Sequence, residues 1–200
     1  TGGKSQGLPG PLAVGAVAWE MVSNPFYDNG PNDKGIGLQM LFSLGRLAIG
    51  YATAALVAIF LGVVLGLSPT LYRAVNPYVQ ILKPISPLAW MPLFLYTIKN
   101  AGMAAVLVVF MSSLWPTLAN TAFGVASIRR DYLNVSAILQ LSWFGRLFRV
   151  ILPAAAPAIV AGLRISVGSA WVAIVAAEML IGGTGIGYFV WNEWNNLALT

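Results

Sequence analysis

The sequence predicts an all-α protein embedded in a membrane, and three observations support this prediction. Hydrophobic residues make up 58% of the 200 residues, whereas charged residues make up only 8%. Soluble domains are about 45–50% apolar and about 25% charged, so this chain has too little polar surface for water. The mean hydropathy is +0.78, and three long apolar runs divide the chain.

These runs cover residues 41–67, 102–128 and 154–181. Each is about 27 residues long, or about 40 Å of helix at 1.5 Å per residue, which spans a hydrocarbon core of about 30 Å. We therefore predict three transmembrane helices. Residues 11–22 are too few to span a bilayer, and residues 24–37 are rich in Asn and Gly, so we expect a loop outside the membrane.

The stretch between the first two runs is broken by proline. Its prolines are Pro69, Pro77, Pro84, Pro87 and Pro92. Proline removes a backbone donor and interrupts helices, yet residues 84–98 are uncharged. We expect an interfacial helix over residues 70–82, followed by a broken membrane segment over residues 84–98. Broken segments occur at membrane depth only inside a bundle or along a cavity, so Pro87, Trp90 and Pro92 are candidate residues of a translocation path. A proline-kinked packing helix is the alternative.

The basic residues favour one orientation in the membrane. If the run at 41–67 points inward and the broken segment crosses back, six basic residues lie on the cytoplasmic side, as the positive-inside rule requires. They are Arg73, Lys83, Arg129, Arg130, Arg146 and Arg149. The tail from residue 182 onward carries Trp and Tyr residues, which are typical of the membrane interface.

Several function classes are excluded or disfavoured by composition. The chain contains no Cys and no His, and its six Asp and Glu residues are scattered. We therefore expect no metal site and no nucleophilic or intramembrane catalytic centre, so an intramembrane enzyme is a weak hypothesis. A net charge of +5 without a basic cluster does not indicate nucleic-acid binding. The glycines at residues 183–187 do not fit a dinucleotide-binding pattern, and we interpret them as a tight turn after a helix.

Three charges lie inside the predicted spans, where ionisable residues usually have a function. Arg46 and Glu178 fall at similar depth near the outer ends of helices of opposite direction, so we predict that they contact each other. Arg164 lies roughly 16 Å from the inner end of its helix at 1.5 Å per residue. It either offers a positive charge to a passing anion or bonds to carbonyl groups of the broken segment.

The loop at residues 129–153 is too apolar to be a solvated linker. We predict a short amphipathic helix over residues 132–141, with Asp131 as its N-cap. Its apolar face needs either a protein partner or the lipid headgroups. A passive channel would need no such docking element.

The same loop resembles the cytoplasmic coupling loop of binding-protein-dependent ABC importer permeases. The family motif ends in an aliphatic residue, any residue and Leu-Pro, which matches Val150 to Pro153. In that alignment Asn134, Val135 and Ser136 occupy the family's Glu-Ala-Ala positions, and Gln140 occupies its Gly position. The resemblance implies that the residues coupling this chain to an ATPase are Asp131, Asn134, Val135, Ser136, Ala137, Ile138, Leu139, Gln140, Leu141, Ser142, Leu152 and Pro153.

Other motifs narrow the resemblance to one group of importers. Pro25-Phe-Tyr-Asp-Asn-Gly30, Pro87-Leu-Ala-Trp-Met-Pro92 and Gly162-Leu-Arg-Ile165 are similar to permeases for nitrate, bicarbonate, cyanate, taurine and sulfonates. The first of these motifs and Asp33-Lys-Gly35 favour nitrate. Bicarbonate, cyanate and sulfonates or taurine are the alternative cargoes.

The resemblance implies an architecture and a set of partners. We expect one domain over residues 1–200, the membrane domain of a type I ABC importer, with four to five of the family's six spans present and one further span on each side. The expected partners are a second copy of the permease, two cytoplasmic ATPase subunits, a periplasmic substrate-binding protein and the lipid bilayer of the bacterial inner membrane. ATP and Mg²⁺ would bind the ATPase subunits, and no cofactor is expected in this chain.

Overall fold

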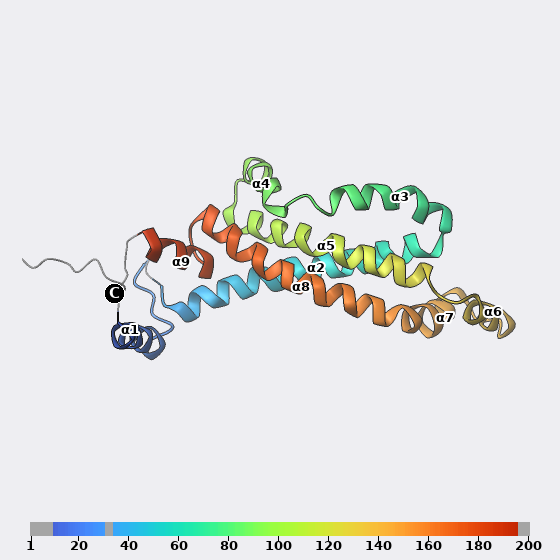
Figure 1. Cartoon of the computed structure of the whole chain (residues 1–200), viewed down its shortest axis with the longest axis horizontal. Helices are drawn as coiled ribbons and strands as arrows, with labels where there is room; N and C mark the ends of the chain where they lie inside the picture. The colour runs from blue at the N-terminus through green and yellow to red at the C-terminus, as the bar shows by residue number, and fades with distance from the viewer. Residues whose placement is uncertain (1–9, 31–33, 196–200) are drawn as a thin grey trace, which may run out of the picture.

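The computed structural model describes residues 10–30 and 34–195, which fold into a bundle built mainly of helices (Figure 1). Its elements are α1 (Pro11–Ser23), α2 (Ile36–Leu67), α3 (Pro69–Leu82), the 3₁₀ turn η1 (Pro87–Trp90), α4 (Met91–Ile98), α5 (Ala101–Ala126), α6 (Arg130–Ile138), α7 (Trp143–Arg146), the π-helical turn η2 (Leu147–Ile151), α8 (Leu152–Ile181) and α9 (Ile186–Asn195).

Three helices are long and apolar enough to cross a membrane, as predicted. They are α2, α5 and the continuous helix Trp143–Ile181, which includes α8. In Figure 1 α2, α5 and α8 run lengthwise beside one another, and α5 lies between the other two in the contact pattern. The chain is therefore a multi-pass membrane protein, and α1, with 13 residues, is short, as expected.

A stripe of small residues explains how closely α2 and α5 pack. Gly50, Ala54, Ala58, Gly62 and Gly66 recur at every fourth position of α2, and all five are buried. A Cβ atom added at Gly62 would lie 2.6 Å from Cβ of Thr121 on α5. Such spacing lets two backbones approach, which is how helices associate in lipid without a hydrophobic driving force.

The interface between α5 and α8 combines small residues with hydroxyl groups. A Cβ at Gly124 would lie 2.5 Å from Cβ of Ala158, and Thr117 Oγ1 donates to Ser166 Oγ at 2.9 Å. Both hydroxyl-bearing residues are fully buried. Polar pairs of this kind link membrane helices because lipid offers no other hydrogen-bond partner.

The prediction that residues 70–82 form an interfacial helix is wrong. In Figure 1 α3 runs back along α5, from the end of α2 toward the end of the bundle where α4 lies. Its buried Val79 packs against Ala58 of α2 and against Leu114 and Leu118 of α5. Val79 of α3 is thus covered by protein, whereas Tyr78 and Ile81 are 67% and 66% exposed, and the sequence pattern alone does not distinguish these two sides.

The predicted broken segment exists, but its break lies near its start. The helical segments Pro69–Leu82 and Pro87–Ile98 together meet the length and apolarity of a span and are bent by 85°. Proline at positions 84 and 87 denies the backbone donors that a continuous helix would need. Counting this bent pair, the described part of the chain provides up to four spans.

The third long helix begins earlier than predicted. It starts at Trp143 rather than near residue 154, so the non-helical part of the loop at 129–153 is short. Pro153 lies in the first turn of α8, as expected, but that turn is preceded by the π-helical turn, in which the Leu152 N–H donates to the Leu147 carbonyl. A proline ring presses on the carbonyl of the residue four positions before it, and the wider turn relieves that contact.

Candidate functional site

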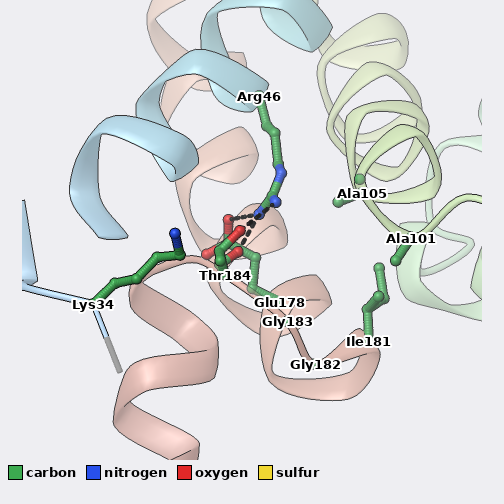
Figure 2. Close-up of a pocket in the computed structure, with 10 residues that line it drawn as sticks. Lys34, Arg46, Ala101, Ala105, Glu178, Ile181, Gly182, Gly183 and Thr184 are labelled. Atoms are coloured by element: carbon green, nitrogen blue, oxygen red, sulfur yellow. Dashed lines mark hydrogen bonds and ion pairs between the residues drawn. The ribbon is translucent and has the colours of Figure 1, made fainter. Parts of the chain in front are cut away.

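The predicted contact between Arg46 and Glu178 is present at the end of the bundle where α2 begins and α8 ends. Arg46 Nη1 donates to Glu178 Oε1 at 2.9 Å, and the two side chains are 21% and 2% exposed. Arg46 also donates to the carbonyl and the hydroxyl of Thr184 (Figure 2). The ion pair is therefore partly buried and has additional hydrogen-bond partners.

The Glu178 carboxylate is further held by groups that the sequence analysis did not single out. Ser43 Oγ donates to Glu178 Oε2 at 2.7 Å, and the Gly187 N–H donates to the same oxygen at 3.2 Å. Gln39 Oε1 accepts the Gly185 N–H. Ser43 and Gln39 lie seven and eleven residues before Gly50, which are close to whole numbers of helical turns, and this spacing places them on the same buried face of α2 as the small-residue stripe.

The glycines at 183–187 form the tight turn that was predicted, and the structure shows why glycine is needed there. Gly183 and Gly185 have φ values of 98° and 141°, a region that side chains disfavour. A Cβ atom at Gly185 would lie 2.2 Å from Cδ of Glu178, and one at Gly187 would lie 2.1 Å from the Val175 carbonyl oxygen. The turn can therefore close over the carboxylate only with glycine at these two positions.

A cavity of about 420 Å³ lies beside this ion pair. It is lined by Lys34, Arg46, Ala101, Gly102, Ala105, Glu178, Ile181, Gly182, Gly183 and Thr184 (Figure 2). Both cations in its wall are already paired, because Lys34 Nζ lies 2.6 Å from Asp28 Oδ2. The paired charges cancel, so the arrangement connects the end of α2 with the α8–α9 turn and adds no net positive charge.

The ion pair between Lys34 and Asp28 lowers the pKa of the aspartate. The hydrogen bond from Lys34, followed by that from the Gly30 N–H, lowers the pKa of Asp28 below its ordinary value. Asp28 and Lys34 also form an isolated antiparallel bridge, so the charge pair closes the loop between α1 and α2.

Arg164 differs from Arg46 in its exposure and, among the residues that the structure describes, in its lack of a partner of opposite charge. Its side chain is exposed, and in the part of the chain that the structure describes, no hydrogen bond or ion pair is recorded for it. The predicted alternative, bonding to carbonyl groups of the broken segment, is therefore not seen within residues 84–98. Glu178 is the sole acidic residue in the sequences of α2, α5 and α8, and it lies about 21 Å further along the helix at 1.5 Å per residue.

The loop at residues 129–153 contains a short helix, α6, at the far tip of the bundle (Figure 1). α6 ends at Ile138, whereas residues 132–141 were predicted to be helical, because Gln140 has a left-handed φ of 47°. Asp131 is not the N-cap. The helix begins two residues earlier than predicted, so Asp131 lies in its first turn and pairs with Arg129 at 2.8 Å, where a negative charge suits the helix dipole.

The side chains of this loop divide clearly by exposure. Ser136 is buried and donates to the Leu133 carbonyl at 2.7 Å. Leu141 is half-buried. The other predicted coupling residues of this loop have exposed side chains, namely Asp131, Asn134, Val135, Ala137, Ile138, Leu139, Gln140 and Ser142. Ile138 and Leu139 are 79% and 64% exposed, so the tip of the bundle presents apolar side chains that nothing in the described chain covers.

Comparison with known proteins identifies the family. The family described as the inner membrane component of binding-protein-dependent transport systems matches residues 40–199. The chain belongs to this family. The matched range contains α5, α8, the loop at residues 129–153 and most of α2, and the family's membrane domain is that of a type I ABC importer.

Three relatives show where in the family this permease lies. The nitrate import permease protein of Synechocystis sp. is 45% identical over 99% of this chain and 72% of its own length. That of Synechococcus elongatus is 46% identical over 94% of this chain and 68% of its own length. A bicarbonate transport system permease protein of Synechocystis sp. is 46% identical over 85% of this chain and 61% of its own length.

The bent segment of the permease packs near the ion pair. Pro87 and Trp90 of η1 are half-buried, and Pro92 is exposed. The neighbouring Met91 is buried against a cluster that includes Ile174 of α8. These three candidate path residues therefore lie over the half of α8 that carries Glu178, and none of them is recorded as a partner of Arg164.

Proposed function

We propose that this permease forms the membrane pathway of an ATP-driven importer that carries nitrate into the cytoplasm of a bacterium. The observation that supports the cargo is the identity of 45–46% to two nitrate import permeases, one of which matches over 99% of this chain. A bicarbonate permease is equally similar over 85% of the chain, so bicarbonate is the second candidate.

The assembly that we propose contains two copies of this permease in the inner membrane, two cytoplasmic ATPase subunits and a periplasmic binding protein. The 200 residues act as a single membrane domain. ATP and Mg²⁺ bind the ATPase subunits, and this chain hydrolyses nothing itself. The support is the family match, since the family is named for its dependence on a binding protein.

The coupling function is assigned to α6 and the residues that follow it. We infer that an ATPase subunit covers the exposed Val135, Ile138 and Leu139, because exposed apolar side chains at the tip of a helix are stable only against a partner or lipid. We assign to the same contact the exposed residues near these three in the sequence, namely Asp131, Asn134, Ala137, Gln140 and Ser142. We assign Ser136, Leu152 and Pro153 to the same function. Ser136 is buried within α6, and Leu152 packs with Leu133 of α6 against one apolar cluster.

We assign roles in the translocation path according to which charged residues have a partner of opposite charge. The Arg46–Glu178 pair holds the outer ends of α2 and α8 together beside the bent segment with Pro87, Trp90 and Pro92. Arg164, without a recorded partner, supplies the positive charge that an anion meets within the bilayer. When the ATPase subunits close, they move α6, and the spans exchange outward for inward access to this path.

Uptake by whole cells tests the cargo. Cells that lack their own nitrate importers would express the permease with its cognate ATPase subunits and binding protein, and uptake of labelled nitrate would be measured with and without excess bicarbonate. We expect saturable nitrate uptake that bicarbonate does not compete away. Uptake of labelled bicarbonate but not nitrate would favour the second candidate.

A further inference from the structure

Arg164 is placed where a charge is least tolerated. It is the thirteenth residue of α8, about 18 Å from Leu152 at 1.5 Å per residue, and α8 has 30 residues. Its side chain is exposed on this chain and is too far from either end of the helix to reach water by bending along it. A guanidinium at this depth faces a protein interface or an aqueous path rather than lipid.

The face of α8 around Arg164 has the pattern of a helix interface. Ala161, Arg164, Gly168 and Trp171 follow one another at intervals of three and four residues, which places them on one side of the helix. All four are exposed, and a Cβ atom added at Gly168 would meet nothing within 4 Å. Gly and Ala in this arrangement allow a second helix to approach closely.

We propose that a second copy of this permease covers that face, and that Arg164 and the partner's Arg164 together form an intramembrane binding site for one planar, singly charged oxyanion. The proposal rests on the proposed function and specifies where the cargo binds within the path. In the pair that we propose, a two-fold axis that passes beside this face would bring Arg164 next to the partner's Arg164, so the covering face of α8 would supply a second guanidinium and no carboxylate.

The charge requirement then specifies the ligand. Two guanidinium groups without a counter-charge repel each other in a medium of low dielectric constant. An anion between them removes the repulsion, and a guanidinium presents a planar fork that matches two oxygens of a planar oxyanion. Nitrate and bicarbonate both satisfy this geometry, whereas a cation or a neutral solute does not. Neither copy forms the site alone.

The first part of the experiment tests whether the two faces meet. The 200 residues contain no Cys, so Gly168→Cys introduces one reactive thiol beside Arg164. In membranes that contain the assembled transporter, mild oxidation should join two copies through this thiol. Leu56→Cys, on an α2 side chain that is 72% exposed, is the matched control and should not cross-link. Absence of cross-linking at residue 168 would overturn the shared site.

The second part tests whether the site holds the anion. The thermal midpoint of the purified permease–ATPase complex should rise when sodium nitrate replaces sodium gluconate at equal ionic strength. Lys83→Gln, which removes an exposed charge outside the site, should keep this rise. Arg164→Gln should abolish it and slow nitrate uptake at least tenfold while ATPase subunits still co-purify. A rise unchanged in Arg164→Gln would overturn the proposal.

A second variant keeps the test decisive if Arg164→Gln fails to assemble. Arg164→Lys retains the charge but loses the planar fork, so it should assemble with a weakened nitrate effect, and an undiminished effect would overturn the proposal. If wild-type transporter takes up bicarbonate and not nitrate, the proposed cargo is wrong. The same variants tested with sodium bicarbonate then decide the arginine site separately.

Discussion

Replacing Glu178 by glutamine tests the energetic role of the ion pair between α2 and α8. The carboxylate accepts hydrogen bonds from Arg46, Ser43 and the Gly187 N–H, and Glu178→Gln keeps the shape but removes the charge. Breaking a buried ion pair costs about 3–5 kcal/mol because the other charge is left uncompensated. Arg46 is 21% exposed and retains Thr184, so we expect a loss of about 2–3 kcal/mol.

The loss is measurable as thermal stability in detergent. For a chain of this size, about 2.5 kcal/mol corresponds to a fall of about 5–10 °C in the unfolding midpoint. The midpoint can be followed as the fraction of monodisperse protein that survives heating. Glu193→Gln is a matched control on α9, since the described structure records no ion pair for that carboxylate, and it should shift stability by less than about 0.5 kcal/mol.

Exchanging the two charges isolates the contribution of the ion pair from that of the neighbouring groups. Arg46→Glu and Glu178→Arg should each lower the midpoint, and the double variant should recover part of the combined loss because opposite charges again face each other. If Glu178→Gln behaves like Glu193→Gln, or if the double variant shows the plain sum of the single losses, the reasoning is refuted.

Three further predictions concern the loops. Ile138→Asp should leave the thermal midpoint unchanged, because the side chain is 79% exposed, but should abolish co-purification of ATPase subunits; retained subunits would contradict the docking assignment. Gln140→Gly should raise the midpoint by about 2–4 °C, since a left-handed conformation costs an L-residue about 1 kcal/mol; an unchanged midpoint would mean that this turn is unstrained. The lowered pKa of Asp28 means that its pairing with Lys34 stabilises the fold above the ordinary aspartate pKa of about 3.9 and is lost as pH falls through the lower folded-state pKa. The midpoints of wild type and Asp28→Asn should therefore differ at pH 7 and converge in acid, and a constant difference would contradict the assignment.

The sequence was sufficient to predict the features that depend on position along a single helix. Three long apolar runs became three long helices, and the matched depths of Arg46 and Glu178 predicted their contact. Both inferences use only the rise per residue and the alternating direction of successive spans. Neither needs knowledge of how side chains pack.

The wrong predictions concern features that depend on side-chain packing or on the exact residue at which a helix begins. Amphipathic periodicity shows that α3 has an apolar face but does not show whether lipid or protein covers it, and Val79 is in fact buried against α5. A shift of two residues at the start of α6 moved Asp131 from the N-cap into the first turn. Gln39 and Thr184 gained their roles only because α2 meets the turn after α8.

The continuity of the helix Trp143–Ile181 has a mechanical consequence. This single element of 39 residues begins next to the coupling loop, carries Arg164 near its middle and ends beside Arg46 through Glu178. If α8 turns as one unit, the rotation that displaces Arg164 also pulls Glu178 away from Arg46 and Ser43. The π-helical turn at Leu147–Ile151 and Pro157 inside α8 both interrupt the regular hydrogen bonding near its inner end. We therefore expect the outer ion pair to open whenever this helix rotates far enough to move the central arginine.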